Sequence, residues 1–179
     1  MDADNVYQKA YNEALKQVTK EVEANAGALY KGYIDANADS IYRTYIESIS
    51  QSLYEKIAAQ VFYQEFIDKG FSEADAEEYL QLAIEKGMIT DLANKMTDDQ
   101  KEQIITGALA SLTDEQKKQI REGALESLTS SQKKQIRDGY IDQLMKSEEV
   151  TKQITEAVSA VVGTAAASIT SLKGQLDNY

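Results

Sequence analysis

Three consecutive near-copies of a 16-residue unit occupy the middle of the chain, and they constrain its fold more than any other feature. They begin at Met96, Leu112 and Leu128 and share the pattern apolar-Thr-acidic/Ser-x-Gln-Lys-x-Gln-Ile-x-x-Gly-Ala/Tyr-Leu/Ile. A tandem repeat of this kind usually builds length, stacking or a displayed surface, and seldom a catalytic site. The repeats therefore predict a repetitive architecture, and they indicate neither a reaction nor a ligand.

Each unit begins with the signature of a helix N-terminus. Thr97, Thr113 and Thr129 each stand three residues before a glutamine, which is the spacing of a capping box. Since each residue of a helix turns by about 100°, a straight helix would rotate successive 16-residue units by roughly 160°. Breaks at Thr113 and Thr129 would let all three units bury the same face. The sequence thus predicts three separate helices within residues 97–144.

A glycine recurs in the middle of each repeat helix, at Gly107, Gly123 and Gly139. Glycine within a helix costs about 1 kcal/mol relative to alanine. Close approach of a neighbouring helix is the natural reason to keep it, so we expect close packing at these three positions.

The remainder of the chain also has a helical composition, and it contains no proline. Apolar spacing predicts long helices over 5–36 and 39–69, with a weaker 12-residue echo in LYKGYI at 29, IYRTYI at 41 and LYEKIA at 53. We interpret the tyrosines of this echo as core or interface residues whose hydroxyls reach water. Ser72 is expected to cap the next helix, which should stop at Gly87.

The last predicted helix, 147–176, has apolar residues in four-three spacing. This helix-pairing face comprises Ile154, Val158, Val161, Ala165 and Leu172. We expect it to pair with the first helix, or with another copy of the chain. The predicted fold is all-α, with long terminal helices in an antiparallel coiled coil. Its segments are 1–71, a head of shorter helices over 72–146, and 147–179, forming one structural unit.

The side chains that the sequence lacks narrow the chemistry. There is no His and no Cys, which excludes Ser-His-Asp or Cys-His catalysis and the usual zinc sites. Asp35-x-Asn37-x-Asp39 resembles the start of a calcium loop, but Ser40 and Ile46 stand where that loop needs Gly and Glu. We therefore expect no enzyme, no catalytic residues, no cofactor and no metal.

The net charge of -11 disfavours nucleic acid and anionic membrane surfaces as partners. The longest uncharged run extends from Ala157 to Leu172 and includes several Ser and Thr residues. A membrane span needs roughly 18–20 apolar residues, so this run is too short and any membrane contact is expected only through flanking segments. The opening residues lack the basic start and apolar run of a signal peptide.

The C-terminal stretch Ala165-AASITSLKGQLDNY, following long helices, resembles the extracellular region of Gram-positive membrane proteins of the YhgE/Pip (phage-infection-protein-like) type, or similar inserts of ABC-transporter permeases. The Leu-x-x-Gly heptads of that family are absent, and no functional residue is carried over. The resemblance implies a non-catalytic, surface-exposed helical segment tethered to a membrane at both ends.

Three functions are compatible with the sequence. The first is a non-catalytic helical interaction or stalk domain, the extracellular segment of a larger bacterial membrane protein, which binds a protein partner or its own copies. The second is a free-standing cytoplasmic helical adaptor or self-assembling coiled coil. The third is a small-molecule-binding bundle that uses the tyrosine-rich N-terminal half.

Overall fold

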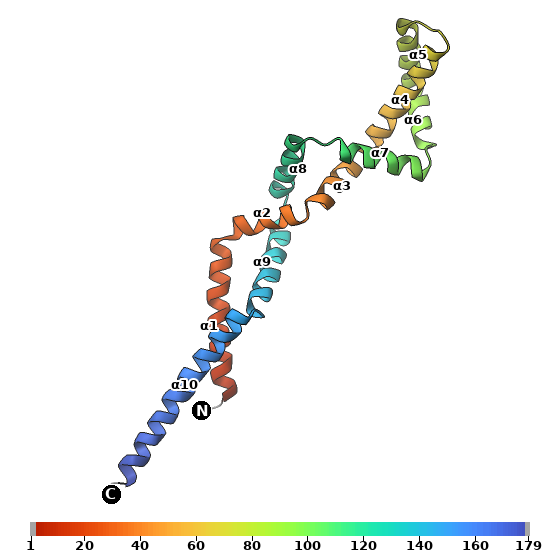
Figure 1. Cartoon of the computed structure of the whole chain (residues 1–179). Helices are drawn as coiled ribbons and strands as arrows, with labels where there is room; N and C mark the ends of the chain where they lie inside the picture. Colours follow the sequence, from red (N-terminus) through yellow and green to blue (C-terminus); the bar gives the residue numbers. More distant parts are fainter. Residues whose placement is uncertain (1–2, 178–179) are drawn as a thin grey trace. The chain divides into compact units, whose positions relative to one another are not determined.

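The computed structural model describes the backbone of residues 3–177 and the side chains of residues 4–163 and Lys173. Within this part every regular element is a helix, so the predicted all-α class is confirmed (Figure 1). The helices are α1 (Ala3–Ala24), α2 (Ala26–Ala36), α3 (Ala38–Ser48), α4 (Ser50–Asp68), α5 (Glu73–Glu85), α6 (Met88–Asn94), α7 (Asp98–Ala110), α8 (Asp114–Glu126), α9 (Ser130–Met145) and α10 (Glu148–Asp177).

The chain divides into two compact units, one of residues 34–126 and one of residues 1–33 together with 127–179. In the unit of residues 34–126, the chain reverses its direction through α5 and α6. We call the helices before this reversal the outgoing helices and those after it, beginning with α7, the returning helices. In this unit α5 and α6 pack on α4, while α7 and α8 pack on α3. Its core consists of small and branched side chains together with Tyr54. The buried members are Ile46, Tyr54, Ala58, Ala83, Ile89, Ala93 and Ile105.

In the other unit α1 packs against both α9 and α10. Its buried core contains Val18, Val22, Met145, Val150 and Ile154, and the partly buried Val158 packs against it. Both ends of the chain therefore belong to this unit. The division follows the pairing of outgoing and returning helices, rather than the sequence order of the predicted segments.

Of the predicted helix-pairing face, Ile154 and Val158 contribute to the core that α1 shares with α9 and α10. Val161 is 42% exposed. Ala165 and Leu172 lie outside the residues whose side chains the structure describes.

The prediction of unbroken helices over 5–36 and 39–69 is wrong, because α1 ends before Asn25 and α3 ends before Ile49. A side chain hydrogen-bonds a helix carbonyl at each of these breaks. The Asn25 side-chain nitrogen donates to the Glu21 carbonyl (2.9 Å), and the Ser48 hydroxyl donates to the Tyr45 carbonyl (2.6 Å). At Ile49 the backbone N–H donates to the Ile46 carbonyl, while the Ser48 hydroxyl occupies the Tyr45 carbonyl. Such insertion of a side chain into the backbone ladder is a recognised cause of helix bending.

The breaks at 25, 37 and 49 follow the 12-residue echo of the sequence, and burial has the same period. A straight helix would turn a 12-residue pattern by about 120° per repeat, so regular breaks are needed to keep one buried stripe. Every described residue of α1–α4 that is buried falls on one of two series with this spacing. These are Val6, Val18, Tyr42 and Tyr54, and Val22, Ile34, Ile46 and Ala58.

The predicted N-caps are present. Thr97, Thr113 and Thr129 each accept a hydrogen bond from the backbone N–H three residues on, and the glutamine there accepts one in return. The Ser72 hydroxyl accepts from the Asp75 N–H (3.2 Å). The breaks at Thr113 and Thr129 thus separate the repeats as their spacing predicts. Gly87, which follows α5, has a φ of 76°, a conformation that favours glycine.

Replacing Thr97 by Ala should lower the free energy of unfolding by about 1 kcal/mol, because the Gln100 N–H loses its acceptor at the start of α7. The measurement is urea unfolding followed by far-UV circular dichroism. Thr106→Ala is the matched control, since Thr106 is exposed in the same helix and Ala there should leave stability unchanged or higher. Equal losses in the two variants would contradict a capping role.

Candidate functional site

Three tyrosines of the 12-residue echo meet three lysines of the 16-residue repeat, in reverse order along the chain. In each meeting the lysine Nζ lies over the face of the tyrosine ring, which is a cation–π arrangement. The distances to the ring centroid are 5.6 Å for Lys133 and Tyr30, 5.6 Å for Lys117 and Tyr42, and 5.5 Å for Lys101 and Tyr54. The two sequence repeats are therefore partners in one repeating contact.

An arginine one helical turn beyond the lysine completes two of the three contacts. Arg137 Nη1 donates to the Tyr30 hydroxyl (2.6 Å), and Arg121 Nη1 donates to the Tyr42 hydroxyl. These hydrogen bonds raise the pKa of both guanidinium groups above the usual arginine value. The equivalent residue of the first repeat is Ile105, which is buried in the same core as Tyr54. The third contact therefore keeps its lysine but has a buried apolar side chain in place of the arginine.

The two repeats match in length although they differ in residue number. Twelve helical residues extend about 18 Å, and the 13-residue helices α7 and α8 extend about 19–20 Å. The remaining three residues of each 16-residue unit form the link to the next helix. A helix on the returning side is therefore about as long as a 12-residue step on the outgoing side.

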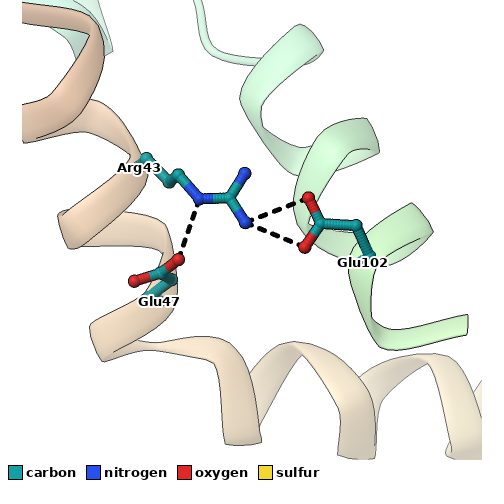
Figure 2. Close-up of polar contacts among 3 residues, drawn as sticks. All are labelled: Arg43, Glu47 and Glu102. Atoms are coloured by element: carbon teal, nitrogen blue, oxygen red, sulfur yellow. Dashed lines mark hydrogen bonds and ion pairs between the residues drawn. The ribbon is translucent and has the colours of Figure 1, made fainter. Parts of the chain in front are cut away.

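An ion-pair cluster adds a contact that is specific to α3 and α7. Figure 2 shows Arg43 between two carboxylates: its Nη2 lies 3.0 and 2.8 Å from the oxygens of Glu102, and its Nε lies 2.9 Å from Glu47. The hydrogen bond from Arg43 lowers the pKa of Glu102. Lysines stand at the Glu102 position in the other two repeats, so this cluster distinguishes the first repeat from its copies. All three side chains are exposed, and such pairs contribute little to stability.

Each unit also contains an open groove between an outgoing and a returning helix. In the 34–126 unit, a groove of about 850 Å³ is lined by residues that include Ile57, Val61, Ile104 and Gly107. In the other unit, a groove of about 860 Å³ is lined by residues that include Tyr33, Ile136, Gly139 and Tyr140. Ile57 and Tyr33 hold the same position in the 12-residue repeat, and Gly107 and Gly139 hold the same position in the 16-residue repeat. The two grooves are therefore equivalent.

The glycines open the grooves instead of allowing close packing. A Cβ atom built on Gly107, Gly123 or Gly139 would meet no atom within 4 Å. The expected close approach of a neighbouring helix at these positions is therefore wrong within the described part of the chain, because the partner helix packs through the tyrosine contacts beside them. The middle repeat has an exposed tyrosine, Tyr45, and an exposed glycine, Gly123, at the corresponding positions.

Charged side chains are scarce along both grooves. Glu21 is the single charged residue among the 13 that line the groove in the unit of residues 1–33 and 127–179. The other groove has three charged residues among 17: Lys56, Glu65 and Lys95. The face contributed by the 16-residue repeats is uncharged in both grooves and carries glutamine, alanine, glycine and apolar side chains. These surfaces suit an uncharged or apolar helix.

Comparison with protein-family models, curated proteins and solved structures finds no match for the chain. Among the described residues, no group of three or more His, Cys, Asp or Glu side chains is placed to hold a metal ion. In the same part of the chain, no helix combines the length and the apolar character needed to cross a membrane.

Sequence reasoning found both repeats but not the contacts that join them. It identified the tyrosine echo that contains Tyr30, Tyr42 and Tyr54, and it identified the lysine-bearing 16-residue repeat, but it did not pair the two. The sequence did contain a signal for these contacts, because the tyrosine echo and the lysine-bearing repeat each occur three times.

Tyr42→Phe keeps the ring beneath Lys117 and removes the acceptor of Arg121, so we expect a small decrease in the urea midpoint. Tyr42→Ala removes the buried ring as well and should cost about 3 kcal/mol. Tyr45→Phe, in the same helix with its ring exposed, is the control and should unfold like the wild type. A Tyr42→Phe protein as stable as the wild type would mean that the hydroxyl contact contributes nothing.

Proposed function

We propose that this chain is a non-catalytic helical interaction domain whose grooves each accept a helix of another protein molecule, including a second copy of itself. We further propose that it is the extracellular segment of a larger bacterial membrane protein, in which it acts as a spacer. The observation that carries the interaction role is the pair of equivalent, glycine-lined grooves in the two units.

The composition of the grooves supports this role. In a chain with 27% charged residues and a net charge of -11, the returning side of each groove is uncharged. Glycine in a helix sacrifices stability and lets another backbone come close. Because no atom of the described chain occupies the space above these glycines, an incoming helix is the partner that would use it.

The arrangement of the chain ends supports the spacer role. Residues 1–33 and 127–179 belong to one unit, and α1 packs against α10. An insert between two membrane spans needs its two ends in one place. We propose that α1 and α10 pair as an antiparallel coiled coil through the face to which Ile154 and Val158 belong. The resemblance to YhgE/Pip-type proteins agrees with this topology.

The double variant Gly107→Leu/Gly139→Leu should lose the concentration-dependent self-association that we expect of the wild type in sedimentation velocity. Its stability should rise by about 0.5–1 kcal/mol per site, since Leu is a better helix former and both sites are open. Gly27→Leu lies on an open helix position away from both grooves and should gain stability without losing association. Identical sedimentation of wild type and double variant at all concentrations would contradict docking of a second copy.

Small-angle scattering at monomer mass tests the spacer role. A compact chain of 179 residues has a radius of gyration of about 16 Å. A spacer should give a clearly larger value. A radius of gyration equal to that of a compact chain would contradict the spacer role and leave the interaction role standing.

A further inference from the structure

A second exposed apolar surface lies at α5, away from the two grooves. Phe71, Tyr79 and Leu82 are 41%, 42% and 44% exposed. With Asp75 and Glu78 they form what we call the α5 face. None of its residues lines either groove.

An aromatic cluster fixes the α5 face in place. Phe66 of α4 stacks on Tyr79 with ring centroids 5.0 Å apart, and Phe71 forms T-shaped pairs with both rings at centroid distances of 5.2 and 5.7 Å. Figure 1 shows α5 alongside α4, which supplies Phe66. Aromatic pairs in these geometries are attractive beyond their buried area. Phe71 and Tyr79 therefore form a preorganised platform whose outer surface remains open to solvent.

Carboxylates are interleaved with these apolar side chains. Asp75 precedes Tyr79 by four residues, and Glu78 precedes Leu82 by four, so each acid neighbours an apolar side chain on the helix surface. Within the described part of the chain, neither acid takes part in an ion pair. Charges left without a partner beside an apolar platform are available to a cationic ligand.

The surroundings are also negative. Residues 62–88 contain seven carboxylates and two lysines, a net charge of -5. On the adjoining side of α4, partial burial and then the charges of Glu73 and Glu77 raise the pKa of Tyr63. Two copies of the chain meeting at this surface would oppose like charges, and an anionic membrane would be repelled. The net negative charge of residues 62–88 therefore favours a positively charged ligand.

We propose that the α5 face binds a basic amphipathic helix of another protein, with its apolar side on Phe71, Tyr79 and Leu82 and its lysines or arginines beside Asp75 and Glu78. This inference rests on the interaction role proposed above but uses a different surface and a different partner. Lysine and arginine pair with carboxylates and also lie well over aromatic faces, so one type of side chain satisfies both parts of the surface.

The test is titration of the full chain with a synthetic amphipathic peptide of leucine and lysine that carries one tryptophan. The chain contains tyrosines but no tryptophan, so tryptophan emission excited at a wavelength that tyrosine does not absorb comes from the peptide alone. We expect saturable binding that weakens as salt rises, because exposed charges are screened. A leucine–glutamate peptide of the same length should not bind. No saturable binding of the basic peptide at low salt, or equal binding of the acidic peptide, would overturn the proposal.

The double variant Glu78→Lys/Leu82→Ser should weaken binding about tenfold or more, since it reverses one charge and removes one anchor. Glu156→Lys/Val162→Ser likewise reverses one charge and removes one apolar side chain, at exposed positions of α10, and should bind like the wild type. Wild-type affinity in the α5 variant would overturn the assignment to this face.

The groove variant Gly107→Leu/Gly139→Leu separates the two proposals. It should bind the basic peptide normally even where self-association is lost. Loss of peptide binding in this variant would place the peptide in a groove and overturn the α5 assignment.

Discussion

The placement of a lysine ammonium over a tyrosine ring fixes the register in which outgoing and returning helices meet. A one-residue slip would turn each cation by about 100° around its helix and take it off the ring. The contact occurs with the same geometry at Tyr30, Tyr42 and Tyr54. The positions of the cores and the opening of the grooves both depend on this register, because the glycines lie on the same helices as the lysines.

The contacts at the tyrosines determine how outgoing and returning helices align, and they add little to the free energy of folding. The cations are partly exposed, and a cation–π contact at an exposed site is worth roughly 0.5–1 kcal/mol. Stability comes instead from two modest apolar cores, one around Ile46 and Ala58 and one around Val18 and Val22. Where the first repeat replaces arginine with Ile105, the contact merges into the core of the 34–126 unit. This unit therefore combines an apolar end with a polar one.

Local signals in the sequence predicted where the repeat helices begin, but they did not predict where α1 and α3 end. The capping boxes at Thr97, Thr113 and Thr129 depend on residues three apart, so the spacing alone determines them. The breaks at Asn25 and Ile49 carry no glycine or proline, and they arise from the need to keep a 12-residue stripe on one side. The role of Gly107, Gly123 and Gly139 was mistaken for a related reason. Glycine in a helix is compatible with a close neighbour or with an open groove, and only the tertiary arrangement decides between them.

Each 12-residue step between tyrosines pairs with one 16-residue step between lysines, and this pairing restricts how the chain can change its length. An extra 12-residue step inserted between Tyr30 and Tyr42 would leave one tyrosine without a cation, and every contact beyond it would be displaced. A viable insertion must add a 12-residue step on the outgoing side and a 16-residue step on the returning side, at corresponding places. Growth or shrinkage of this architecture is thus a coupled event at two distant positions in the gene. Related chains should differ in length by such linked pairs.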